Sequence, residues 1–247
     1  MTPVAMPDTR LQGASNFRDL GGLRNRHGER FRQGLVFRSD HLANLSADDQ
    51  VALRQMGVTH SMDLRGVQEH AARPYAIDGV RHVPLPIEPT VVRRVEALLR
   101  RGTVPTESET VALMCETYRD FVLHHGPTFG ALLRHLIEHP TPQVFHCTAG
   151  KDRTGMAAAM LLGALDVDRD TVMEDYLLTN QRYRRDAAWE GQGPEHVMAI
   201  LWQVQEAFLN SALETIDHHF GGMDAYLEGP VGLDRMQREA LRRRYLA

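Results

Sequence analysis

Apolar and polar residues alternate along this chain in a pattern that predicts short strands separated by helices. Short apolar runs bounded by turn residues have the length of buried strands and cover 34–39, 58–64, 80–85 and the residues up to Phe145. Longer stretches with helical spacing lie between and after them, mainly at 46–57, 129–138, 170–185, 195–219 and 233–245. Strands that alternate with helices predict an α/β fold, with a mainly parallel central sheet flanked by helices.

Single residues sharpen several boundaries of these elements. Ser46 is placed to cap a helix that ends at Gly57, and Pro84 puts the strand at 80–85 on the edge of the sheet. Residues 1–12 are expected to form a flexible N-terminal arm, so that a single domain covers 13–247 and ends in a helical C-terminal region.

A helical insertion is predicted at 88–125, where Gly102 and Pro105 interrupt it. Its apolar positions suit two arrangements, packing on the sheet or a lid over a pocket. Within 88–118 these positions are Val91, Val92, Val95, Leu98 and Leu99. The sequence leaves both arrangements open.

Composition excludes several classes of protein. The chain has 247 residues, 43% of them hydrophobic, which is enough for a full core, and its net charge of −4 indicates no general affinity for nucleic acid. Two cysteines form no disulfide framework, and no leader of basic and then apolar residues is present. No run is apolar enough to span a membrane. We therefore expect a cytoplasmic protein, although export by a route without a classical signal stays open, and the oligomeric state is not indicated.

Residues 146–155 carry the strongest chemical signal, His-Cys-Thr-Ala-Gly-Lys-Asp-Arg-Thr-Gly. The apolar residues before them and the small residues after them predict a strand, a tight loop and a helix, with Cys147 at the start of the loop. Amides that open a helix bind anions, and their field favours the thiolate form of a cysteine. The loop therefore predicts a nucleophile, Cys147, in a phosphate site formed by Thr148, Ala149, Gly150, Lys151, Asp152 and Arg153.

Two of the following side chains fit the cleavage of a phosphate ester. The planar guanidinium of Arg153 can clamp two phosphate oxygens. Thr154 can offer its hydroxyl to the sulfur and help it leave when water breaks a phosphocysteine. No metal or cofactor is required, because Arg153 and the loop amides supply the charge stabilisation.

This stretch resembles the signature loop of the protein tyrosine phosphatase superfamily, His-Cys-x5-Arg-Ser/Thr. The Lys151-Asp152 pair is similar to an atypical bacterial branch, whose members act on phosphotyrosine, often on phosphoserine or phosphothreonine, and on phosphoinositides. Weaker marks of that branch occur elsewhere in the chain in the expected order, and with them the resemblance covers about 13–246. These marks are Asn16 to Gly22, Phe37-Arg38-Ser39, Asp63-Leu64-Arg65 with Glu69, and Asp175-Tyr176-Leu177. It implies the cysteine-phosphatase fold and a dual-specificity phosphatase whose partners are phosphorylated proteins or phosphoinositides.

Lys151 is the only lysine among the 28 Lys and Arg residues of the chain. A compact, mobile ammonium in a phosphate loop can fill a role that arginine cannot. We interpret it as a group that meets a second negative charge on the substrate.

A general acid must protonate the leaving oxygen, and the sequence offers two main candidates, ahead of Asp78 and Asp120. Asp63 ends a predicted strand at the ligand side of the sheet, but a structural pairing with Arg65 or Arg18 is equally plausible for it. Asp152 lies inside the loop, where it can act as the acid or fix Lys151 or Arg153 by ion pairing. The choice between the two stays open.

Several further residues are expected to support the loop. The family pattern implies that the ring of His146 orients the loop through hydrogen bonds. Asn16, Arg18 and Asp19 are expected to brace it, with a turn and a local salt bridge as the alternative. Arg38 lies near the end of the strand predicted at 34–39, at the edge of the sheet where ligands bind.

The chain has 13 histidines, yet we predict no metal site. His135 and His139 have the i,i+4 spacing that can bind zinc, but the sequence shows no companion set of carboxylate or cysteine ligands. We interpret this pair as part of a solvated helix face.

Two other functions share some of these features. A non-catalytic phosphate-binding module would need no nucleophile, so Cys147 argues against it. Another Cys-loop enzyme is the second alternative: a sulfurtransferase would not require the Arg-Thr ending, and an arsenate reductase usually needs further cysteines, of which only Cys115 is available.

Overall fold

The computed structural model describes residues 11–88, 90–185 and 193–247, without the side chain of Val92. Its sheet has the strand order β1-β2-β5-β3-β4, in which β1 is antiparallel to β2 and the other neighbours are parallel. The strands are β1 (Arg18–Asp19), β2 (Val36–Ser39), β3 (His60–Asp63), β4 (Arg81–Pro84) and β5 (Gln143–His146). The predicted α/β fold with a mainly parallel sheet is confirmed, and β4 lies at the edge as Pro84 indicated.

Helices make up most of the remaining described chain. A short 3-10 helix covers Leu42–Asn44, and the α-helices are α1 (Ala47–Gln55), α2 (Val67–Ala72), α3 (Thr90–Arg100), α4 (Glu107–His124), α5 (Gly126–Glu138), α6 (Asp152–Ala164), α7 (Arg169–Leu177), α8 (Thr179–Arg182), α9 (Glu195–Trp202), α10 (Glu206–Phe220), α11 (Met223–Glu228) and α12 (Arg235–Tyr245). The cap of α1 is as predicted, because the side chain of Ser46 accepts a hydrogen bond from the amide of Asp49. Among these described helices, none is both long and apolar enough to cross a membrane.

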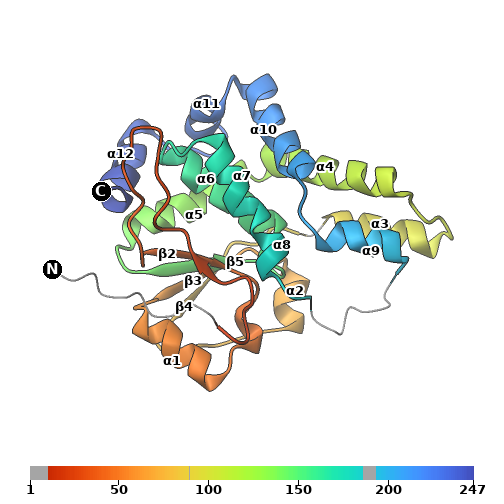
Figure 1. The fold of residues 1–247 in the computed structure, drawn as a ribbon, viewed down its shortest axis with the longest axis horizontal. Coiled ribbons are helices and arrows are strands. Elements are labelled where there is room, and N and C mark those ends of the chain that lie inside the picture. Colours follow the sequence, from red (N-terminus) through yellow and green to blue (C-terminus); the bar gives the residue numbers. More distant parts are fainter. Residues whose placement is uncertain (1–10, 89, 186–192) are drawn as a thin grey trace.

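The sheet separates two apolar cores because successive side chains of a strand point to opposite faces. On β5, Phe145 belongs to the large core and Val144 to the small one. The large core packs against α5, α6 and α7, which lie over one face of the sheet, whereas α1 covers the other face (Figure 1). Nearly all of α6 is buried in this core, which fixes the helix that opens at the signature loop.

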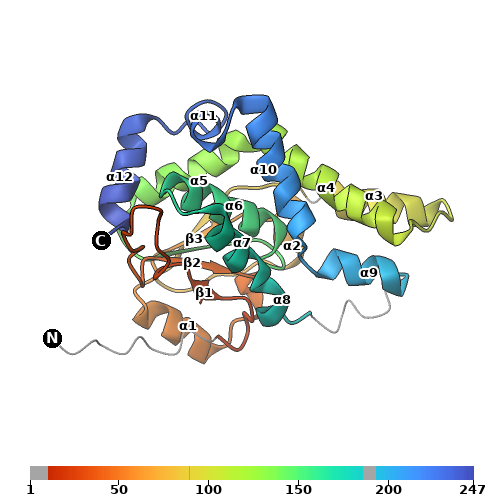
Figure 2. The same ribbon diagram turned by 45° about the horizontal axis from the view of Figure 1, so that its top comes forward.

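The insertion forms α3 and α4, and α9 joins them far from the sheet. Both views show α3, α4 and α9 extending together on the same side of the molecule (Figures 1 and 2). The stretch at 195–219 was predicted as a single helix, but it is broken at Gln203-Val204-Gln205 into α9 and α10. Asn180 exchanges two hydrogen bonds with the backbone of Val204, both at 2.8 Å, which gives the broken helix backbone new partners. The stretch at 170–185 is likewise two helices, α7 and α8.

Residues 11 and 12 pack against the domain. Leu11 is buried in the small core, and the amide of Gln12 donates to Asp49 Oδ1 at 2.7 Å. Residues 11 and 12 therefore do not belong to a flexible arm, and residues 1–10 lie outside the described residues.

Candidate active site

Cys147 directly follows β5 and begins the loop that ends at the first residue of α6, Asp152. Its side chain is buried, and Gly150 supplies the sharp bend of the loop at φ 66°. A Cβ on Gly150 would lie 2.5 Å from the carbonyl oxygen of Ser39, so only glycine fits this close approach. The strand, tight loop and helix predicted for 144–155 are confirmed.

The carbonyl groups of this loop are held from behind by two side chains. Asn16 Nδ2 donates to the carbonyl oxygens of Ala149 at 3.0 Å and Gly150 at 2.9 Å, and Arg38 Nη2 donates to Gly150 at 2.9 Å. With its carbonyls turned toward Asn16 and Arg38, the loop is held in a fixed conformation.

A buried ion cluster positions the two bracing side chains. Asp175 on α7 accepts from Arg18 Nε at 2.8 Å and from Arg38 Nη1 at 2.5 Å, and Arg18 Nη1 also donates to Asn16 Oδ1 at 2.5 Å. Burial alone would raise the pKa of Asp175, but the charges of Arg38 and Arg18 hold it below its ordinary value. Arg18 therefore braces the loop through Asn16, as expected.

Asp19 has a different place from the one we expected. Its carboxylate accepts from the amides of Gly21 and Gly34, both at 2.7 Å, so it closes the turn between β1 and β2. No contact between its side chain and the loop is found in the described structure.

His146 lies fully buried beneath the loop. Nδ1 donates to the carbonyl oxygen of Cys147 at 3.1 Å, which leaves Nε2 to accept from the hydroxyl of Tyr75 at 2.6 Å. Burial lowers the pKa of His146 to about 4, so the ring is neutral near pH 7. A neutral ring with these two partners orients the end of β5.

Arg153 is held by a carboxylate that the sequence marked only as a family feature. Nη1 donates to Glu69 Oε2 at 2.5 Å and to the carbonyl oxygen of Ile87 at 2.9 Å, while Nη2 donates to Glu69 Oε1 at 2.9 Å. Burial alone would lower the pKa of Arg153, but Glu69 and Cys147 raise it. Since a guanidinium has five N–H donors, these contacts leave the edge formed by Nε and Nη2 able to donate to an anion.

The two candidate acids differ sharply in their surroundings. Asp63 is buried, with Arg65 Nη2 at 2.7 Å, His70 Nδ1 at 3.0 Å and His82 Nε2 at 3.1 Å. Burial opposes its ionised form, yet His146 and Arg65 hold the pKa of Asp63 well below its usual range. It stays a carboxylate and does not line the cavity described below.

Of the two candidate acids, Asp152 is the one that lines the cavity. Its side chain is 26% exposed, and Oδ1 accepts a hydrogen bond from the hydroxyl of Tyr118 at 2.9 Å. Tyr118 in turn contacts the hydroxyl of Tyr176 at 2.6 Å. Both tyrosines are buried, and burial raises the pKa of each well above its ordinary value, so they stay hydrogen-bond donors.

Lys151 lines the cavity, but its ammonium binds the broken end of the helical stretch. Its ammonium donates to the carbonyl oxygens of Leu201 at 2.5 Å and Gln203 at 3.0 Å, and lies 3.8 Å from Asp152 Oδ2. Burial lowers the pKa of Lys151, while Asp152 and Cys147 oppose that change. The lone lysine thus links the loop to α9.

Two threonine hydroxyls of the site, that of Thr154 after Arg153 and that of Thr148 after Cys147, have distinct environments. Thr154 Oγ1 is fully buried and has no hydrogen-bond partner within the described part of the chain. Thr148 Oγ1 donates to Glu69 Oε1. A buried hydroxyl without a partner is costly, so Thr154 is suited to a partner that forms during a reaction.

A cavity of about 330 Å³ opens over the loop. Loop residues from Cys147 to Arg153 form its floor, and Glu69, Arg65 and His41 lie at its sides. The opposite wall comes from α3, α4 and α9 and is mainly apolar: Val91, Val95, Leu99, Met114, Met198, Leu201 and Trp202. The insertion therefore faces the floor across the cavity.

The loop, its arginine and the surrounding sheet have the arrangement that the sequence resemblance implied. The sequence profile of the tyrosine phosphatase family matches residues 9–247. The chain belongs to the tyrosine phosphatase family. It is a cysteine-dependent phosphatase, and the predicted phosphatase function is confirmed.

Two relatives are similar to this phosphatase over most of its length. A Cupriavidus necator protein, whose name assigns it provisionally as a tyrosine-protein phosphatase, is 35% identical over 97% of this chain and 89% of its own. The triple specificity protein phosphatase PtpB of Mycobacterium tuberculosis is 30% identical over 88% of this chain and 91% of its own. Among solved structures, TpbA of Pseudomonas aeruginosa is 18% identical over 76% of this chain and 89% of its own, with a TM-score of only 0.35.

Three residues of the site escaped a functional assignment from sequence. Tyr118 carries no motif and lies on a helix 34 residues before its partner Asp152. Glu69 and Asp175 stood within stretches that resemble the family, but nothing in the chain indicated that they pair with Arg153 and with Arg18 and Arg38. For Tyr118 and Asp175 the signal would have been a hydroxyl or a charge at an otherwise buried helical position, whereas Glu69 lies on α2, which has no buried residue.

Proposed function

We propose that this phosphatase hydrolyses phosphotyrosine in proteins through a phosphocysteine formed on Cys147. The observation that supports this most is the shared cavity: Cys147, Arg153 and Asp152 line its floor, and the wall opposite them is apolar. An apolar wall suits the ring of a tyrosine whose phosphate reaches the floor.

In the first step, the thiolate of Cys147 attacks phosphorus and the bond to the leaving oxygen breaks. The amides from Thr148 to Arg153 and the free edge of the Arg153 guanidinium hold the phosphoryl oxygens as charge develops on them. Glu69 fixes the guanidinium plane from its other side, so that little reorientation is needed in the transition state.

Asp152 is the general acid in this proposal. It lines the cavity, whereas Asp63 is ionised, enclosed by Arg65 and two histidines, and absent from the cavity lining. The hydroxyl of Tyr118 orients the carboxyl of Asp152. Asp63 is then a positioning residue that acts through His146 and Arg65.

In the second step, water attacks phosphorus and the sulfur leaves. Asp152, now deprotonated, accepts the proton of that water. The unpartnered hydroxyl of Thr154 donates to the departing thiolate, which supports the role that the loop motif implies. Phosphate is released and the thiolate of Cys147 is restored.

A second class of substrate is favoured by Lys151. Lys151 lines the cavity beside the apolar wall. Release of its ammonium from the carbonyls of Leu201 and Gln203 would let it meet a further negative charge on a phosphate monoester with an apolar part, such as a phosphoinositide. Phosphoserine and phosphothreonine lack the ring that reaches the wall, and we rank them below phosphotyrosine. A cytoplasmic, reducing location belongs to this proposal because the mechanism needs Cys147 reduced.

The test is phosphate release without added metal from phosphotyrosine, phosphoserine and phosphothreonine peptides and from phosphoinositides. We expect turnover of phosphotyrosine that is abolished in Cys147→Ser. Lys151→Met should lower the rate on phosphoinositides more than on phosphotyrosine. Absence of wild-type turnover on every substrate would overturn the proposal and favour a phosphate-binding module.

The identity of the general acid can be tested with substrates whose leaving groups differ in their need for protonation. Asp152→Asn should slow phosphotyrosine hydrolysis by about 10²–10⁴-fold, and p-nitrophenyl phosphate much less, since a good leaving group needs little protonation. Asp63→Asn serves as the comparison and should show no such dependence on the leaving group. The reverse pattern would assign the acid to Asp63.

A further inference from the structure

Three histidine rings meet at the end of the sheet opposite the active site. His60 begins β3, while His135 lies in the last turn of α5 and His139 directly follows that helix. The same strand ends at Asp63, which contacts His146 beneath the loop that begins at Cys147. Since a strand rises about 3.3 Å per residue, the cluster lies about 10 Å along β3 from Asp63.

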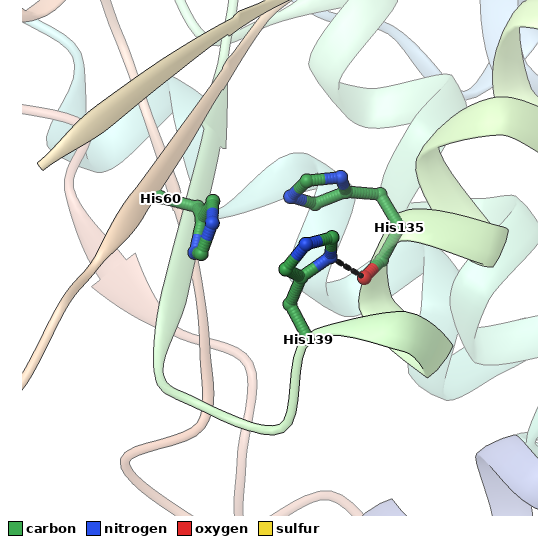
Figure 3. Close-up of side chains that lie close together, drawn as sticks. All are labelled: His60, His135 and His139. Atoms are coloured by element: carbon green, nitrogen blue, oxygen red, sulfur yellow. Dashed lines mark hydrogen bonds between the residues drawn. The ribbon is translucent and has the colours of Figure 1, made fainter.

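The rings pack against one another and are half-buried, so His135 and His139 belong to a ring cluster as well as to a partly solvated helix end. Ring centroids lie 4.1 Å apart for His135 and His139, 4.5 Å for His60 and His139, and 5.0 Å for His60 and His135. Figure 3 shows the three rings turned toward a shared space between β3 and the end of α5. One potential ligand atom from each ring lies within 4.8 Å of the others.

In two of the rings, Nδ1 already has a hydrogen-bond partner, which leaves Nε2 for another contact. His139 Nδ1 donates to the carbonyl oxygen of His135 at 3.2 Å, so its Nε2 carries a lone pair. His60 Nδ1 contacts the hydroxyl of Thr59 at 2.9 Å. Metal-binding histidines characteristically have this second interaction, which sets the tautomer and the ring orientation.

His135 supplies the observation that points to a ligand. Its Nε2 atom is buried and has no hydrogen-bond partner in the described structure. Figure 3 shows a nitrogen of this ring directed toward His60. A buried polar atom without a partner carries a free-energy cost, which a bound cation would remove.

We propose that His60, His135 and His139 form a binding site for a zinc-class divalent cation, with water in the fourth position. Nitrogens of a tetrahedral zinc site lie about 3.4 Å apart at the usual bond length of about 2.0–2.1 Å, so small ring rotations from the present arrangement complete the site. Three imidazoles without a carboxylate favour zinc, copper or nickel over magnesium or calcium.

The protonation states agree with this geometry. Burial lowers the pKa of His135 to about 4 and also lowers the pKa of His60, so both rings are neutral near pH 7, as ligands must be. The nearby positive charge is Arg81, which pairs with His60 across β3 and β4 and whose side chain is exposed. Water screens that charge more than it would a buried one.

A second cluster, Asp63 with His70 and His82, is a weaker candidate. Arg65 already donates hydrogen bonds to the carboxylate of Asp63, from Nε at 2.9 Å and from Nη2 at 2.7 Å. A cation there would compete with a buried guanidinium for the same oxygens. The three-histidine cluster has no such competitor among the described residues.

The test measures zinc binding to the full chain in a Cys147→Ser background, because a catalytic thiolate would itself bind zinc. We expect one Zn²⁺ per chain by calorimetry, visible bands with Co²⁺, and a rise in Tm of about 5–10 °C at a hundredfold excess over Kd. His135→Ala should weaken binding at least tenfold, and His139→Gln provides a second variant that keeps a polar side chain.

Two controls locate the ion. The double variant His218→Ala with His219→Ala removes two exposed histidines on α10, and His82→Ala removes the competing cluster; both should leave the affinity unchanged. Absence of stoichiometric binding, or affinity that depends on His82 but not on His135 and His139, would overturn the proposal. Because the readouts do not depend on turnover, they are independent of the proposed phosphatase substrate.

Discussion

The floor of the cavity and its apolar wall are held by opposite kinds of interaction. The floor consists of the loop 147–153 and the buried polar side chains behind it, Asn16, Arg18, Arg38 and Asp175, and nearly every contact there is a short hydrogen bond or ion pair. The wall consists of apolar side chains on α3, α4 and α9. Directional contacts specify one geometry, whereas apolar contacts tolerate several.

This difference separates the chemistry from the choice of substrate. The floor must place Cys147 and Arg153 within a fraction of an ångström, which buried hydrogen bonds to charged groups can do. The wall needs only shape and apolar surface to accept the part of the substrate beyond the phosphate. Lys151 joins the two regions, because it belongs to the loop and binds the carbonyls at the end of α9.

The largest effect should come from breaking the floor at Asp175. In Asp175→Ala, Arg18 and Arg38 lose their shared carboxylate and remain as buried unpaired charges. We expect a loss of about 3–5 kcal/mol in the free energy of unfolding, seen as a fall in Tm of about 6–20 °C, together with loss of phosphatase activity.

Asp170→Ala on the same helix is the matched control, since Asp170 is exposed in the first turn of α7. It should cost no more than about 1 kcal/mol. Equal losses in urea denaturation for the two variants would show that the ion cluster does not stabilise the floor.

The second effect concerns pH and the residue that supports Asn16. Asp40 accepts the amide hydrogen of Asn16 at 3.1 Å, and burial raises its pKa from 3.8 to about 6. The folded state therefore binds this proton more tightly than the unfolded state, so Asp40 lowers stability as pH rises from about 4 to 6, by about 3 kcal/mol in all. Asp40→Asn removes that titration, and its stability relative to wild type should rise by this amount between pH 4 and pH 7.

Urea denaturation of both proteins at several pH values measures this difference. Asp78→Asn, the same change at an exposed carboxylate, is measured alongside as the control for the substitution itself. A constant difference for Asp40→Asn would contradict the proposed origin of the raised pKa.

The sequence predicted the floor better than its supports. A strand, a loop and a helix around Cys147 follow from a local pattern of apolar and small residues, so they could be recognised from ten consecutive positions. Asp175 meets Arg18 across 157 residues, and Tyr118 meets Asp152 across 34. Such pairings depend on the packing of α4 and α7 around α6, which no local pattern contains.

The errors have the same physical origin. The break between α9 and α10 contains no proline or glycine. Instead, Lys151 donates to a freed backbone carbonyl, and Asn180 both donates to and accepts from the backbone of Val204. His60 lies 75 residues before His135, so the third ring beside the His135 and His139 pair could not be seen in the helical spacing alone. In both cases the tertiary contact decides the local structure.

The smallest effect should come from changing the wall while the floor stays intact. Leu99 on α3 lines the cavity, and in Leu99→Ala part of the apolar surface that faces the substrate is lost. We expect KM for a phosphotyrosine peptide to rise about 3- to 10-fold with kcat nearly unchanged, as removal of a small apolar contact predicts. Arg100→Ala, at the exposed neighbouring position, should alter neither constant. If Leu99→Ala lowers kcat instead, the wall takes part in positioning the phosphate, and the separation between a chemical floor and a selective wall is wrong.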